Sequence, residues 1–122
     1  MAQGILIDPK AQTVAVVECD TNSLDAVTRL LGCDYFEVTR LPNDHFLLLD
    51  EEALVRNYRG QGYFHWVGAA QPFVGRGLVF GSSDGDLVTP VLTVAEVQAS
   101  VRFITADVAT SMLSRGGPFL AP

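Results

Sequence analysis

Lysine is nearly absent from this chain of 122 residues, in which Lys10 is the only lysine beside seven arginines. The 14 acidic residues outnumber the eight basic ones, and the net charge at pH 7 is −6. Proteins that hold DNA or RNA without regard to sequence do so through a basic face. A nucleic acid polymer is therefore not an expected partner.

Cysteine is also scarce, with Cys19 and Cys33 the only two. Two cysteines make neither a disulfide framework nor a zinc site, so free thiols in a reducing compartment are expected. His45 and His65 have no cysteine or carboxylate around them at the spacing of metal ligands. We expect no metal ion and no other cofactor.

Long apolar runs are missing as well. No run approaches the roughly 18 residues of a membrane span, and the N-terminus lacks the charged and then apolar pattern of a signal peptide. These absences predict a cytoplasmic protein that does not bind a membrane.

The composition favours one folded domain. Apolar residues make up 48% of the chain and charged residues 18%, which is too apolar for a disordered chain and rather apolar for a small monomer. A chain of this length can bury one core. We therefore expect a single α+β domain over residues 1–122, with a small, mostly antiparallel sheet and two or three helices, and we expect it to self-associate.

The first 92 residues are predicted to form the sheet with one helix. Residues 4–20 favour two strands around a turn at 8–10. Thr21 or Asn22 can cap a helix over 23–31 that ends at Gly32. Residues 34–41 and 45–50 favour a hairpin through the turn at 42–44.

The later segments are predicted in less detail. Residues 63–70 fit either an edge strand or an aromatic-rich connection, and 78–81 fit a short buried strand. Residues 93–115 are predicted to be a C-terminal helical segment. Thr93 and Glu96 form a capping box for a helix that continues through Ile104, and a further helical turn or two can follow.

No catalytic pattern stands out. The carboxylates at 50–52 are typical of a solvated turn, and no serine lies in a nucleophile elbow. Gly75-Arg76-Gly77 precedes a predicted strand, whereas a dinucleotide fingerprint precedes a helix. We expect no catalytic residues and no enzyme.

Arginine is the residue type with the clearest binding potential. Arg56, Asn57 and Arg59 surround Tyr58, a composition that suits a phosphate and a stacked base but equally an exposed polar loop. Arg102 can reach the edge of an interface, or its stem can cover the core.

Four short motifs resemble, in order, those of a family of small phage and prophage proteins that includes the Thoeris anti-defence protein one sponges. They are 49–52 after a hairpin, Asn57 with a nearby arginine, Val74-Gly75 leading into 78–81, and Leu92-Thr93 opening a helix. The resemblance covers residues 34–103.

This resemblance implies sequestration without cleavage. Such sponges bind cyclic ADP-ribose isomers made by immune enzymes, some also bind cyclic oligonucleotides, and they assemble into dimers and hexamers. The implied location is the cytoplasm of an infected bacterium.

The resemblance also implies site residues. Arg59, or Arg56 in its place, and Arg102 correspond to ligand-binding arginines, and Asn57 accompanies them. Leu78 and Asp86 stand where sponges have an aromatic residue and an asparagine, and Phe80, or else Phe73 or Trp66, can supply the missing ring. A carboxylate at position 86 would repel a pyrophosphate.

The acidic composition supports a different class of function. An acidic protein-interaction module could inhibit a host protein by covering a basic surface. Its discriminating feature is a protein partner in place of a nucleotide.

Overall fold

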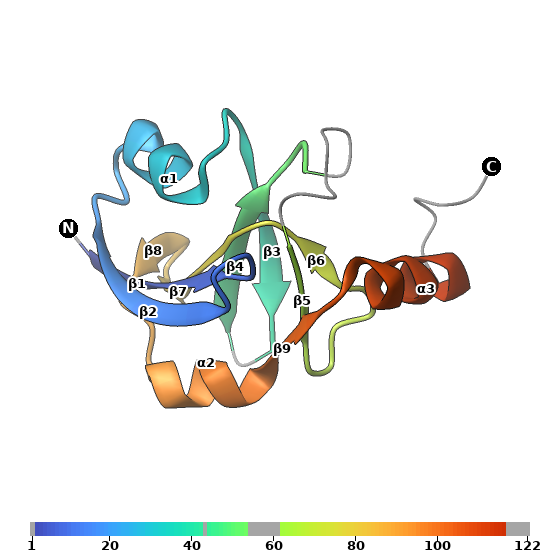
Figure 1. Ribbon diagram of the computed structural model, residues 1–122. Helices are drawn as coiled ribbons and strands as arrows, with labels where there is room; N and C mark the ends of the chain where they lie inside the picture. Colours follow the sequence, from blue (N-terminus) through green and yellow to red (C-terminus); the bar gives the residue numbers. More distant parts are fainter. Residues whose placement is uncertain (1, 43, 54–61, 117–122) are drawn as a thin grey trace.

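Two antiparallel sheets meet face to face in the computed structural model, which describes residues 2–42, 44–53 and 62–116 (Figure 1). These ranges contain nine strands and three helices, and the α+β fold agrees with the sequence prediction. In chain order the elements are β1 (Ala2–Asp8), β2 (Thr13–Cys19), α1 (Leu24–Leu31), β3 (Phe36–Leu41), β4 (His45–Asp50), β5 (Tyr63–Trp66), β6 (Phe73–Val74), β7 (Gly77–Ser83), β8 (Asp86–Val88), α2 (Val94–Ser100), β9 (Val101–Ile104) and α3 (Ala106–Gly116).

The larger sheet has six strands in the order β2-β1-β7-β4-β3, with β8 paired to β7. Its centre is β7, which pairs with β1 through Ile5 and Val79 and with β4 through Leu47 and Val79. The two hairpins predicted from the sequence, β1–β2 and β3–β4, are confirmed and lie on either side of β7.

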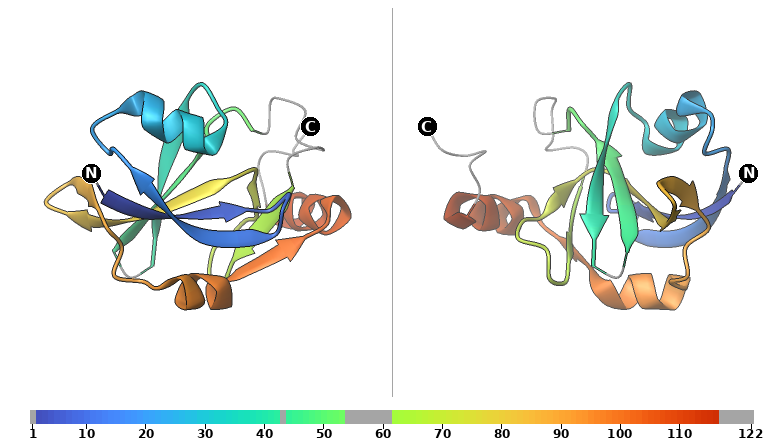
Figure 2. Two further views of the ribbon diagram at one scale, coloured as in Figure 1. Left: turned by 60° about the vertical axis from the view of Figure 1, so that its left-hand side comes forward. Right: turned by 180° about the vertical axis from the view of Figure 1, so that it is seen from behind.

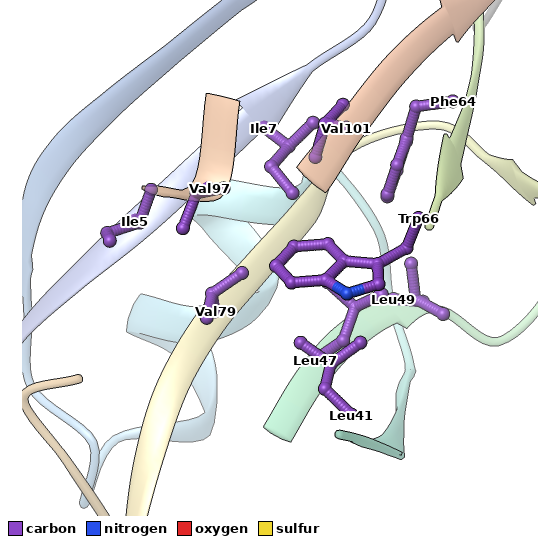
Figure 3. Packing of buried hydrophobic residues seen from close by; sticks show 10 residues of the cluster. All are labelled: Ile5, Ile7, Leu41, Leu47, Leu49, Phe64, Trp66, Val79, Val97 and Val101. Carbon is purple, nitrogen blue, oxygen red and sulfur yellow. The ribbon is translucent and has the colours of Figure 1, made fainter. Parts of the chain in front are cut away.

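Alternating side chains give the larger sheet two apolar faces. On one face Ile5, Ile7, Leu47, Leu49 and Val79 pack against the second sheet and α2. Figure 3 shows this cluster, with Trp66 of β5 at its centre and Val97 and Val101 beside the strands.

On the opposite face, Leu48, Leu78 and Phe80 pack against Val27 and Leu31 of α1. Figures 1 and 2 show α1 and α2 on opposite sides of the larger sheet.

Helix α1 begins at a cap other than the two predicted ones. Ser23, not Thr21 or Asn22, accepts a hydrogen bond from the backbone N–H of Ala26, because it is Ser23 that has the extended backbone immediately before the helix. Gly32 ends the helix in the left-handed region, as predicted.

The second sheet has the order β6-β5-β9 and includes a strand where the sequence predicted a helix. Helix α2 ends at Ser100, and Val101 has extended φ and ψ angles. Residues 101–104 then pair with β5, so that Val101 and Phe103 join the core. The prediction of one helix through Ile104 was wrong because burial against β5 outweighs the helical spacing of the valines.

Residues 63–66, left open between an edge strand and a connection, form the central strand of this second sheet. Tyr63 and Val74 on its outer side pack against Ala53 and Ala109, so α3 covers part of that side. The predicted capping box of α2 is confirmed, because Thr93 and Glu96 exchange both hydrogen bonds.

Candidate ligand-binding groove

The site residues suggested by the sequence do not come together in the described part of the chain. Arg56, Asn57 and Arg59 lie outside the described residues. Leu78 and Phe80 are fully buried beneath α1, so their side chains pack in the core and present no surface to a ligand. Their placement gives both residues a structural role.

The other two suggested residues lie on separate parts of the fold. Asp86 is exposed at the start of β8, where it pairs with Ser83 beside a turn. Arg102 is exposed on β9 and pairs with His65 of the second sheet, so it belongs to a strand and not to a helix. The described residues therefore build no arginine-rich site.

A groove of about 770 Å³ opens instead between the two sheets. One wall is the β3–β4 hairpin, and the other is the connection from β5 to β6 together with β6. The lining is largely apolar, with polar groups on the hairpin side, and consists of Glu37, Thr39, Arg40, Leu41, Pro42, Leu49, Asp50, Glu51, Ala53, Gly68, Ala69, Ala70, Gln71, Pro72, Phe73 and Val74.

The pairing register of β3 and β4 determines which polar side chains face the groove. Glu37 pairs with Leu49 and Thr39 with Leu47, and paired residues share a face of the sheet. Because Leu47 and Leu49 face the second sheet, Glu37 and Thr39 do so too. The groove exists because the second sheet covers the middle of this face and leaves the β3 end open.

The opposite wall is held by several local contacts. The Nε2 atom of His65 lies 3.0 Å from the carbonyl oxygen of Ala69, and the N–H of Val67 donates to the carbonyl of Ser100 at 2.8 Å. The ring of Phe73 contacts that of Phe64, with centroids 5.4 Å apart. These contacts tie the β5–β6 connection to the core and give the groove a preformed wall.

The electrostatic character of the groove is acidic. Burial, and then the neighbouring carboxylate of Glu51, raise the pKa of Glu37 above its usual value. Asp50 is only 6% exposed, and one of its oxygens accepts a hydrogen bond from the N–H of Glu52 at 2.9 Å. Glu37 and Glu51 thus place two carboxylates at one end of the groove, whereas Asp50 pairs with Phe36, which packs on the α1 side of the sheet.

Arg40 does not balance these charges. Its guanidinium carbon lies 5.5 Å from the centre of the Phe46 ring. Phe46 packs on the α1 side of the sheet, so the positive charge is drawn away from the groove face. A ligand offering N–H groups or positive charge suits this end better than a phosphate does.

Sequence reasoning missed the groove because its walls come from segments far apart in the chain. The turn predicted at 50–52 is confirmed in part, because Glu51 is exposed in a turn, but Asp50 is buried at the end of β4. Glu51 also lies close enough to Glu37 to affect the pKa of Glu37. One signal was present. Glu37 lies four residues before Leu41, and residues at even spacing along a strand share a face. Glu37 was therefore expected on the same side of the sheet as Leu41.

Among residues 2–42, 44–53 and 62–116, no three His, Cys, Asp or Glu side chains gather to hold a metal ion. The helices α1, α2 and α3 are all too short or too polar to cross a membrane.

Comparison with known proteins gives a family without a function. Residues 1–101 match the family described as a domain of unknown function, DUF3846, and this range contains both walls of the groove. No curated protein and no solved structure matches the chain. Since the match covers most of the sequence, the chain belongs to the DUF3846 family.

Proposed function

We propose that this protein acts by non-covalent binding, as a phage anti-defence sponge that holds cyclic nucleotide immune signals without cleaving them. The observation that carries the binding role is the groove, whose volume of about 770 Å³ and largely apolar walls are typical of small-molecule sites. The nucleotide class comes from the ordered motifs over residues 34–103. The family description adds no function of its own.

The acidic wall sets a condition on this proposal. Glu37 and Glu51 oppose a pyrophosphate, so the phosphates of a nucleotide have to lie away from β3, with the base or ribose toward the carboxylates. Carboxylates accept hydrogen bonds from the amino and ring N–H groups of bases.

A second candidate is an acidic protein-interaction module that inhibits a host protein. The carboxylates of Glu37 and Glu51 favour it, together with the net charge of −6, because they complement a basic partner. In this case, the groove holds part of a protein.

Calorimetric titration with cyclic ADP-ribose isomers and cyclic di- and trinucleotides tests the first candidate. We expect binding, with intact ligand recovered after heat denaturation. Ala70→Trp, which fills the groove, should abolish binding, whereas Ala95→Trp on the exposed side of α2 should preserve it. A cleaved ligand, or no binding across the panel, contradicts the sponge.

Charge removal separates the two candidates by sign. Glu37→Gln combined with Glu51→Gln keeps an acceptor oxygen for the base at each position and removes the remaining repulsion of the phosphates, so it should strengthen binding of a nucleotide slightly and weaken binding of a basic partner by about tenfold. Unchanged affinity of a bound nucleotide would place its site outside the groove.

A further inference from the structure

The groove lies where two sheet edges meet. Strand β3 is the last strand of the larger sheet, and β6 is the last strand of the second sheet. No described strand pairs with the outer side of either one. Residues of both strands line the groove, which therefore has open backbone edges along its two walls.

An open strand edge is a template for another strand. Strand β3 offers six residues, Phe36–Leu41, and an added strand of equal length would extend for about 20 Å. Every second side chain of the added strand would point over the groove face, alongside Glu37 and Thr39.

Charge decides which strand can be added. Glu37 and Glu51 lie near each other at this edge, and the guanidinium of Arg40 is turned to the other face. A second copy of β3, in the register that sets Glu37 opposite its counterpart, would bring like charges together across the strand pair, which is destabilising. A segment carrying lysine or arginine gains opposite charges at the same positions.

We propose that β3 and the groove form a docking site for an extended, basic segment of another protein, which adds to the edge of the larger sheet. Its backbone hydrogen-bonds to β3, its basic side chains reach Glu37 and Glu51, and its apolar side chains contact the floor near Leu41 and Phe73. This inference rests on the second candidate function and is independent of nucleotide binding.

The test uses the whole protein and a fluorescein-labelled, capped peptide, Lys-Thr-Lys-Thr-Val-Thr-Val, in which every second side chain, basic at one end and apolar at the other, shares the face that would lie over the groove. We expect saturable binding by fluorescence anisotropy and slower hydrogen–deuterium exchange of amides in β3. The same peptide with glutamate in place of lysine should not bind. Methylation of every second peptide nitrogen removes the hydrogen bonds to β3 and should weaken binding by about tenfold or more.

Matched protein variants locate the contact. Glu37→Gln combined with Glu51→Gln should weaken peptide binding by about tenfold. Glu18→Gln makes the same chemical change on β2, the opposite edge of the sheet, and should change binding by less than about twofold.

Three results would overturn the inference: equal binding of the methylated peptide, protection of β2 in place of β3, or no binding of the lysine peptide. If the parent protein binds cyclic nucleotides but not the lysine peptide, the docking site is rejected and the proposal of a nucleotide sponge stands. The reverse result would keep the docking site and reject the sponge.

Discussion

The two faces of the larger sheet are covered differently. On the α1 face, the side chains of Leu48, Leu78 and Phe80 are all fully buried. On the other face, α2 and the second sheet cover β1, β7 and β4, but at β3 they leave a groove that has carboxylates on its wall. Both faces therefore serve stability, since Ile7, Leu47 and Val79 are fully buried as well, and the second face in addition leaves room for binding beside β3.

Truncating an aromatic ring on each face should separate these roles most strongly. Phe80→Ala removes a fully buried ring under α1 and should lower the free energy of unfolding by about 3–5 kcal/mol. Phe73→Ala removes a half-buried groove ring and should cost clearly less, about 1–2 kcal/mol. Urea denaturation of both variants measures the difference, and equal losses would break the comparison.

The crossing point of the two sheets is expected to be sensitive to one added methyl group. A Cβ atom at Gly77 would lie 2.8 Å from both Leu47 Cδ1 and Phe64 Cζ, which belong to the packed core. Gly77→Ala should therefore destabilise the protein by about 1–3 kcal/mol through overpacking. Gly85→Ala is an unsuitable control because of its positive φ, so Ser82→Ala on the exposed part of β7 serves instead.

Removing the helix caps compares the helices on the two faces. Thr93→Ala removes the hydrogen bond that the Thr93 hydroxyl accepts from the N–H of Glu96 and the one that it donates to the Glu96 carboxylate, and it keeps the bond from the backbone N–H at position 93. Ser23→Ala eliminates the single bond to Ala26 at α1. Each should cost about 1 kcal/mol, with the larger loss at Thr93. Thermal unfolding of both variants gives the ranking, and a larger loss at Ser23 would contradict it.

The smallest expected effect is a pH dependence from the groove carboxylates. Because the folded state raises the pKa of Glu37, folding favours its protonated form. Between the ordinary glutamate pKa and the raised one, this group makes the protein less stable as pH increases. Glu37→Gln should remove that loss and stabilise the protein at neutral pH, by no more than about 0.5 kcal/mol since water screens this exposed side chain.

Glu18→Gln on β2 is the matched control for this pH effect. Denaturation of the parent and both variants between about pH 4 and pH 7, which includes the ordinary glutamate pKa, gives the slope of the unfolding free energy against pH. An unchanged slope in Glu37→Gln would show that folding does not raise the pKa of Glu37.

Local patterns were enough to predict the early strands, the end of α1 and the start of α2. Alternation and turn composition predicted β1–β2 and β3–β4, and the glycine after Leu31 predicted the end of α1. Strand β9 was missed because valines at 94, 97 and 101 fit a helical stripe as well as a helix followed by a strand. Only the presence of β5 beside residues 101–104 decides between them.

The candidate site was much less accessible to sequence reasoning. Leu78 and Phe80 lie in a short apolar strand, and sequence alone does not tell a core position from a ligand contact. The groove depends on how the β5–β6 connection faces β3, which is a long-range relation. The loop with Arg56, Asn57 and Arg59 lies outside the described residues, so its proposed role stays a prediction.

The central place of β7 has a consequence for how the chain acquires its fold. The hairpins β1–β2 and β3–β4 consist of neighbouring segments, so each can form soon after it is synthesised. In the larger sheet, β7 lies between the two hairpins and pairs with both. Ile5 of β1 pairs with Val79, which is synthesised more than half the chain later. Until β7 leaves the ribosome, both hairpins expose an unpaired edge, and a chain truncated before residue 77 should aggregate instead of forming a smaller stable domain.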